Sequence, residues 1–354
     1  CFIWKLPNEL LGQIATLLPS NSLLALTQVC QLLREIVAPH YFVLLEFNTP
    51  RSSYLSLDNK GCEALLVWLR TEAFVVPNSL YLSVSRTTKD YHLHALQMFF
   101  ESLAGSKVVS RVHLLLYSGP DNPTLSFVRL LEGIQGSGCK ELTCHGSAWG
   151  EGLRICCAEV TPICSTELQC LELSSSLFFT PLSIAFTLTT LRNAPLVSLR
   201  LTNTGLKAVQ WTSLLGNLRF RCLRSLVVEA ICPTHSLVEF LSRHQVDTLT
   251  IIGVTARLSP LPCSPLRRTC PMTPLPSLTR LDGSPSHILS LFHYAYIPGT
   301  LEYLRVRLGA SSFTDCFLSD VLSCTEHLSG VGELFVRIPA EADPCALALP
   351  QWSS

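Results

Sequence analysis

The chain has 354 residues, with 26 basic and 26 acidic side chains and a formal net charge of zero. A neutral chain argues against binding to nucleic-acid phosphates, because proteins with that function present a basic surface. Hydrophobic residues make up 48% of the chain and charged residues only 15%. This length and composition predict about two domains with ample apolar material for a core.

The 16 cysteines are scattered along the chain without any CxxC pair. That spacing does not predict a zinc site, and we expect reduced thiols that serve as small core residues of an intracellular protein. The two long uncharged runs, 10–33 and 173–191, are interrupted by proline and by polar residues. Because such interruptions are not typical of membrane-spanning helices, we expect no membrane association and a location in the cytoplasm, the nucleus or both.

The first forty residues predict a small helical unit, either a hairpin or three helices. Pro7 suits the first turn of a helix, and Glu9 complements the positive end of the helix dipole. The segment 19–22 reads Pro-Ser-Asn-Ser, which ends one helix and offers caps for the next. A second apolar stripe begins at Leu23, and Pro39 is expected to close it. The apolar positions of the first helix recur at helical spacing and are Leu6, Leu10, Ile14 and Leu17.

This unit has more apolar surface than forty residues can bury by themselves, so it is expected to need a partner. A plain helical cap on a larger domain is the alternative interpretation.

The order of these residues resembles an F-box, with LPxELL at 6–11 and VCxxLR at 29–34. The tryptophan familiar in the third helix is absent, and Ser20-Asn21 replaces an aspartate, departures that resemble the fungal type. The resemblance implies docking onto a Skp-type adaptor, and through it onto the cullin scaffold of a ubiquitin ligase. It implies that the adaptor is contacted by Leu6, Pro7, Leu10, Ile14, Leu17, Leu23, Leu26, Val29, Cys30 and Leu33.

A short motif, leucine-x-x-leucine-x-aliphatic, recurs through the rest of the chain, and its best copy lies at 196–201. The copies are about 28 residues apart, with apolar helical stretches between them, which is typical of leucine-rich repeats. They are centred on Leu82, Leu114, Leu142, Leu171, Leu199, Leu226, Leu249, Leu281, Leu304 and Leu334.

The resemblance implies a three-helix F-box at 1–45. The alternation that follows predicts an α/β chain with an irregular, right-handed leucine-rich-repeat solenoid and a parallel inner sheet at 46–354. The repeats depart from the strict pattern, because Asn203 alone represents the usual asparagine ladder. An ordinary α/β domain with leucine-rich strands is the alternative. The segment 259–276 is dense in proline and is expected to form an exposed, extended loop.

No motif in the sequence predicts catalysis. His92 and His94 are separated by one residue and lie near Asp90, but the sequence shows no further cluster of metal-binding residues to join them. The glycine-rich segments 136–139 and 146–152 lack the order of a phosphate-binding loop. We therefore expect a chain that is not an enzyme, with no catalytic residue, no metal site and no cofactor.

The open face of the inner sheet is the expected site for a protein substrate of unknown identity. Strand residues alternate between the core and this face, and arginines gather on its last strands. Arginine forks suit carboxylates or phosphates. The candidate substrate-binding residues are Arg280, Arg305, Arg307 and Arg337.

These observations favour a substrate-recruiting subunit of a cullin-type ubiquitin ligase that acts by proximity. A leucine-rich-repeat interaction scaffold outside any ligase is the first alternative, and an enzyme with a solenoid-like domain is the second.

Overall fold

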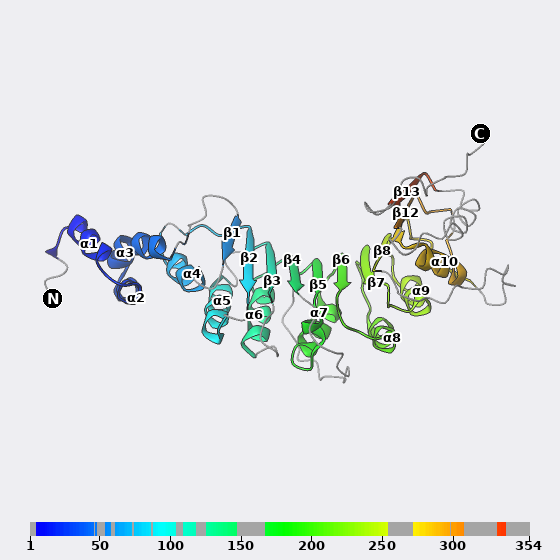
Figure 1. Ribbon diagram of the computed structural model, residues 1–354, viewed down its shortest axis with the longest axis horizontal. Coiled ribbons are helices and arrows are strands. Elements are labelled where there is room, and N and C mark those ends of the chain that lie inside the picture. Colours follow the sequence, from blue (N-terminus) through cyan, green and yellow to red (C-terminus); the bar gives the residue numbers. More distant parts are fainter. Residues whose placement is uncertain are drawn as a thin grey trace, which may run out of the picture. The chain divides into compact units, whose positions relative to one another are not determined.

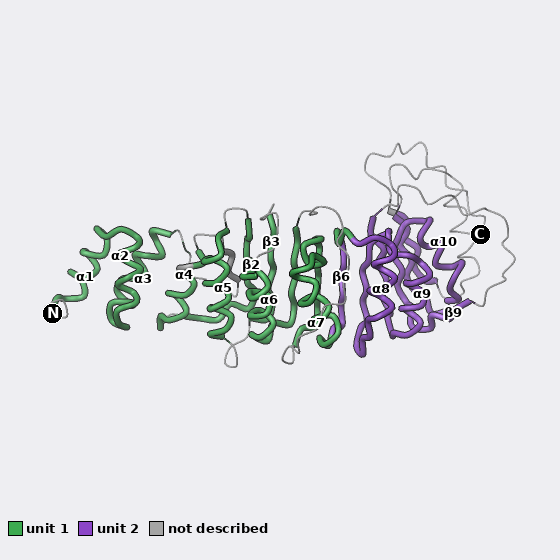
Figure 2. The backbone as a smooth tube through the Cα atoms, turned by 90° about the horizontal axis from the view of Figure 1, so that it is seen from below, with its two compact units in different colours: residues 1–195, 203–205 green, residues 196–202, 206–354 purple. Residues whose placement is uncertain are grey.

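The computed structural model describes residues 5–45, 47, 54–57, 61–72, 74–85, 88–103, 109–117, 125–146, 167–253, 272–297, 299–307 and 331–337. The chain forms two compact units (Figure 2). Unit 1 comprises residues 1–195 and 203–205, and unit 2 comprises residues 196–202 and 206–354.

Unit 1 begins with helices α1 (Asn8–Thr16), α2 (Ser20–Val29) and α3 (Gln31–Leu44). They confirm the expected helical unit as three helices. The prediction that Pro39 closes the helical stripe is wrong, because α3 continues through it to Leu44. A proline inside a helix costs about 3 kcal/mol, and the residues that offset this cost are buried on both sides of it: Val37, Ala38, Tyr41 and Phe42.

Five parallel strands follow in chain order in the described part of unit 1 (Figure 1). They are β1 (Tyr54–Leu57), β2 (Ser79–Val84), β3 (Arg111–Leu116), β4 (Glu141–Gly146) and β5 (Cys170–Ser174). Helices run along one side of the strands. These are α4 (Gly61–Leu69), α5 (Asp90–Leu103), α6 (Leu125–Gly136), the short 3-10 helix η2 (Ser176–Phe179) and α7 (Ile184–Asn193).

Unit 2 repeats the same plan with parallel strands that are again neighbours in chain order. Its strands are β6 (Ser198–Thr202), β7 (Ser225–Glu229), β8 (Thr248–Ile252), β10 (Arg280–Gly283), β12 (Tyr303–Arg307) and β13 (Glu333–Arg337). Its helices are α8 (Ala208–Asn217), α9 (Thr234–Ser242) and α10 (Pro285–Tyr294). The two-residue strands β9 (Thr273–Pro274) and β11 (Ala295–Tyr296) pair separately.

The strand cores consist of leucines and valines that stand side by side in register. In unit 1 one such row is Leu80, Val112, Leu142 and Leu171, and all of these side chains are buried. In unit 2 the corresponding row is Leu226, Leu249, Leu281 and Leu304. The strands of these two rows therefore turn their leucines and valines toward the core and their alternate residues toward the opposite face.

Each of the ten strand positions expected from the leucine motif lies in a strand of the described chain. Strand β1 and helix α4 were not expected, because 54–57 lacks the motif and 61–69 is apolar on nearly every position. The apolar stretch 317–322, one of the helical stretches expected between copies of the motif, and residues 259–271 of the proline-rich segment lie outside the described residues. The end of that segment contributes β9. No described helix has the length and apolar character needed to cross a membrane.

Candidate functional site

The three helices at the start of unit 1 divide their apolar residues between an interior and an exposed surface. Two of the predicted adaptor contacts, Leu23 and Leu33, are only 2% and 3% exposed and form part of the interior. The burial of these side chains holds the helices together. Other buried residues of the three helices are Leu11, Ala15, Val37, Ala38 and Tyr41.

Five large apolar side chains of the predicted contact set remain exposed to solvent. Leu17 is 84% exposed and Val29 is 60% exposed. Leu10 and Ile14 lie one turn apart on α1, so they share one face of that helix. We name these the exposed apolar set: Leu6, Leu10, Ile14, Leu17 and Val29. Exposed apolar clusters of this kind mark protein-interaction sites.

The remaining predicted contacts have different surroundings. Pro7 is exposed and precedes α1 as its N-cap residue. Leu26 and Cys30 are half-buried, and the Cys30 sulfur accepts a hydrogen bond from the backbone N–H of Leu33 at 3.4 Å, which caps α3. Leu32, which the motif did not single out, is also 44% exposed. The sequence contains no signal for the exposure of Leu32, because the motif marks apolar positions without saying which of them the helices bury.

Polar contacts attach α3 to the end of α4. The Gln31 side chain donates to the Glu72 carboxylate at 2.8 Å, and the backbone N–H of Glu72 donates to the Glu35 carboxylate at 3.0 Å. Arg34 donates to the carbonyl of Thr27 at 2.9 Å and to that of Arg70 at 3.4 Å. The three-helix unit is therefore fixed to the first strand–helix unit.

A chain of aromatic rings runs beside these polar contacts. Phe42 at the end of α3 contacts Phe47, whose ring centroid is 6.0 Å from that of Trp68 on α4. Trp68 in turn meets Phe74, and Phe74 meets Phe99 on α5. Aromatic contacts in these edge and tilted arrangements add to the energy of burial, so the first three helices share one core with α4 and α5.

Three of the predicted substrate-binding arginines, Arg280, Arg305 and Arg307, lie on the open face of β10 and β12 in unit 2. The Arg307 guanidinium binds the Asp282 carboxylate through two hydrogen bonds, with Nε 2.6 Å from Oδ1. Arg305 lies farther from the same carboxylate, at 3.8 Å, and Arg280 is exposed. Arg337 is paired with Arg307 in the strand register, which brings the arginines onto neighbouring strands.

The open face of unit 1 has a different chemistry that the sequence did not single out. Tyr81 and His113 stack with ring centroids 4.2 Å apart, and Arg111 forms an ion pair with Glu141 at 2.9 Å. Burial lowers the pKa of His113, and the positive charge of Arg111 adds to that effect, while Glu141 opposes it. This face carries no excess of basic groups.

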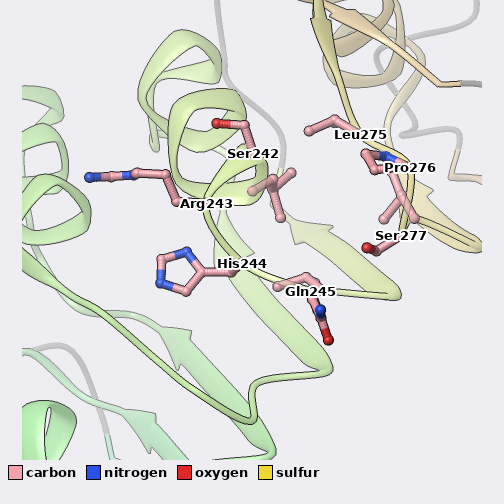
Figure 3. A pocket seen from close by; sticks show the side chains of 10 residues that line it. Ser242, Arg243, His244, Gln245, Leu275, Pro276 and Ser277 are labelled. Atoms are coloured by element: carbon pink, nitrogen blue, oxygen red, sulfur yellow. The ribbon is translucent and has the colours of Figure 1, made fainter.

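One cavity of about 250 Å³ lies in unit 2 between the end of α9 and residues 275–278 (Figure 3). Its wall includes Arg243, but the guanidinium of that residue extends away from 275–277 and donates to the carbonyls of Leu215 and Glu239. In the described part of the chain, no group of His, Cys, Asp or Glu is arranged to hold a metal ion. His244 also lines the cavity, and both of its ring nitrogens are engaged by the backbone of Phe220 and Phe240.

Comparison with known proteins adds one finding to this geometry. Residues 3–42 match the family model described as F-box-like, which covers helices α1 and α2 and most of α3. No curated protein matches the chain. The chain therefore carries an F-box-like domain at residues 3–42, formed by its first three helices.

Proposed function

We propose that this protein is a substrate-recruiting F-box subunit of a cullin-type ubiquitin ligase. In this proposal α1 to α3 bind a Skp-type adaptor, which connects the chain to a cullin. The observation that carries the proposal is the F-box-like match at residues 3–42 together with the exposed apolar set on the same helices. The protein acts inside the cell, in the cytoplasm, the nucleus or both.

The exposed apolar set supports adaptor binding on energetic grounds. Burying a leucine-sized side chain contributes about 1.5–3 kcal/mol, and five such side chains stand exposed on this small domain. An adaptor that covers Leu10, Ile14 and Leu17 would remove that surface from water. The buried Leu23 and Leu33 then act indirectly, by holding the helices that present these residues.

The strand–helix units of 46–354 are, in this proposal, degenerate leucine-rich repeats of a right-handed solenoid of the fungal F-box type. The ten leucine-centred strands, parallel and in register within each unit, support it. The proposal includes a mechanism of proximity, in which the chain brings a bound substrate to the ubiquitin-transferring partners that the adaptor connects to it. The chain itself has no catalytic role, and its partners transfer ubiquitin.

The protein substrate binds the open face of the strands, where Arg280, Arg305, Arg307 and Arg337 lie on neighbouring strands of unit 2. Their guanidinium groups suit an acidic partner.

The experiment is affinity capture of the full chain from cells, followed by mass spectrometry. We expect a Skp-type adaptor and a cullin to co-purify with the wild type. The double variant Leu10→Asp, Leu17→Asp should lose both, because it places charges on the apolar contact surface. The matched control is Val209→Asp, which changes an exposed valine of α8, and it should retain both partners. Recovery of neither protein by the wild type would instead favour a repeat scaffold that acts outside any ligase.

A further inference from the structure

The open face of β10, β12 and β13 combines cations with aromatic rings. The register places Arg280 beside Tyr303, and Arg305 beside Phe335. The Tyr303 and Phe335 rings have centroids 5.1 Å apart, and the guanidinium carbon of Arg305 lies 5.6 Å from the centre of the Tyr303 ring. We name these four residues the arginine–aromatic patch.

Arg307 does not belong to the patch, because its charge is already matched. Asp282 is 9% exposed, and both of its carboxylate oxygens accept hydrogen bonds from the Arg307 guanidinium. A two-point pair of this kind is among the strongest side-chain hydrogen bonds. A ligand that used Arg307 would have to break the pair and leave a largely buried carboxylate without its partner.

Arg280 and Arg305 are available to a ligand. The Arg280 side chain is exposed and makes no hydrogen bond or ion pair with any described residue. The Arg305 side chain is 41% exposed, and its distance of 3.8 Å from Asp282 is too long for a hydrogen bond. Its position over Tyr303 holds the guanidinium above the sheet.

The aromatic half of the patch points to a protein ligand. Phe335 is 47% exposed at a strand position that faces away from the helices. Interface centres are enriched in tyrosine, phenylalanine and arginine, and the residues that contribute most to binding are often of these types. Aromatic rings beside the exposed cations Arg280 and Arg305 therefore suit a segment with both an acidic and an apolar side chain.

We infer that the arginine–aromatic patch binds a protein segment in which an aspartate or glutamate lies within about three residues of an aromatic or large aliphatic residue. This inference deepens the proposed function, on which it rests, by giving the chemical class of the substrate segment. The carboxylate contacts Arg280 and Arg305, and the apolar side chain packs on Tyr303 and Phe335. A carboxylate fits better than a phosphate, because the negative charge of Glu333 on β13 would repel a dianion more strongly than a single carboxylate.

The spacing follows from the geometry of the sheet. Adjacent strands lie about 4.8 Å apart, and an extended ligand advances about 3.3 Å per residue. Arg305 and Phe335 lie on adjacent strands, and Arg280 and Phe335 are separated by one strand. The acidic and apolar groups of the ligand are thus one to three residues apart.

The test is a selection of random displayed decapeptides on the immobilised full chain. The wild type should enrich peptides that carry the acidic–apolar pair. The double variant Arg280→Glu, Arg305→Glu should bind the selected peptides at least about tenfold more weakly, which corresponds to one charge-assisted contact. Phe335→Ala should keep the preference for acid but lose the preference for an aromatic neighbour. The control Arg221→Glu, which changes an exposed arginine outside the strands, should select the same peptides as the wild type.

The inference is overturned if no peptide is enriched, if the enriched peptides lack acidic residues, or if the double variant recovers the same peptides with equal affinity. Replacing the acid of a selected peptide with phosphoserine tests the source of the negative charge, and a phosphopeptide that binds more than about tenfold tighter would overturn the carboxylate assignment. Adaptor binding is measured separately on the same preparation. A chain that selects the expected peptides but binds no adaptor would refute the ligase function while leaving the peptide specificity in place.

Discussion

The backbone N–H of Glu72 donates to the side-chain carboxylate of Glu35 at 3.0 Å, and this hydrogen bond joins the F-box helix α3 to the residue that follows α4 and its turn. The same two segments are bridged by Gln31 and Glu72. Because the rings of Phe42, Phe47 and Trp68 also connect α3 to α4, the F-box-like domain and the first strand–helix unit form one structural body.

Truncating the aromatic connection should destabilise unit 1. Trp68 is 1% exposed and contacts Phe47 and Phe74, so Trp68→Ala should lower the free energy of unfolding by about 3–5 kcal/mol. Glu35→Ala, which removes a partially exposed hydrogen bond, should cost about 1 kcal/mol. Denaturant unfolding of the two variants and the wild type measures both effects. Equal losses of unfolding free energy in the two variants would show that the aromatic rings do not stabilise the connection between α3 and α4.

The register of the strands makes a prediction in β6. Leu199 and Leu201 are completely buried, whereas Arg200 between them is exposed. Leu199→Ala and Leu201→Ala should each lower the free energy of unfolding by about 2–5 kcal/mol, and Arg200→Ala should change it by no more than about 0.5 kcal/mol. Urea titrations of the three single variants decide this, and similar losses at all three positions would contradict the register.

The leucine motif predicted the strands well for a physical reason. In a strand buried on one side, the period of two residues determines which side chains enter the core, and the sequence displays that period at Leu199 and Leu201. The helical unit was harder to predict. Pro39 is a local signal for the end of a helix, but the burial of Tyr41 and Phe42 beyond it outweighs that signal. Burial of this kind depends on tertiary neighbours that the local pattern does not contain.

The candidate sites, too, could be predicted from the sequence only in part. The F-box pattern identified apolar positions of the first helices, but it did not distinguish the buried Leu33 from the exposed Val29. The arginines of the late strands were also recognised together. Their differing availability comes from Asp282, which binds Arg307 tightly and lies farther from Arg305. Such pairing depends on side-chain conformations, and alternation along a strand does not specify them.

Unit 2 should lose stability in mild acid because of His244. The backbone N–H of Phe220 donates to His244 Nε2 at 3.0 Å, so this nitrogen carries a lone pair and the ring is neutral. Its Nδ1 lies 2.6 Å from the Phe240 carbonyl and carries the proton. Burial lowers the pKa of His244 below 6.5, its usual value.

The sign of the effect follows from the lowered pKa. Below about pH 6.5 the unfolded chain binds a proton that folded His244 does not. The free energy of unfolding therefore keeps its full value above that pH and decreases as the pH drops. The slope is at most about 1.4 kcal/mol per pH unit for one such group. Burial also lowers the pKa of His287, which adds to the loss. Urea titrations at pH 7.5, 6.5 and 5.5 measure it, and His244→Gln should reduce the slope. A slope unchanged in that variant would exclude His244 as a source.

The ion pair between Arg307 and Asp282 should stabilise the folded chain. Arg307→Ala leaves a largely buried carboxylate without its two hydrogen bonds, so it should lower the free energy of unfolding by about 1.5–3 kcal/mol. Arg280→Ala removes an exposed side chain and should change it by no more than about 0.5 kcal/mol. Denaturant unfolding of both variants makes the comparison. If Arg280→Ala were the more destabilising change, the assignment of Arg307 to structure would be wrong.

The most direct measurement for the whole account is a calorimetric titration of a purified Skp-type adaptor with the full chain. The account predicts saturable one-to-one binding by the wild type and by Val209→Asp. It predicts that Leu10→Asp combined with Leu17→Asp weakens the affinity at least about tenfold while the circular dichroism of the chain stays unchanged. No binding by the wild type, or equal affinity for the double variant, would contradict the assignment of the exposed apolar set as the adaptor-binding surface.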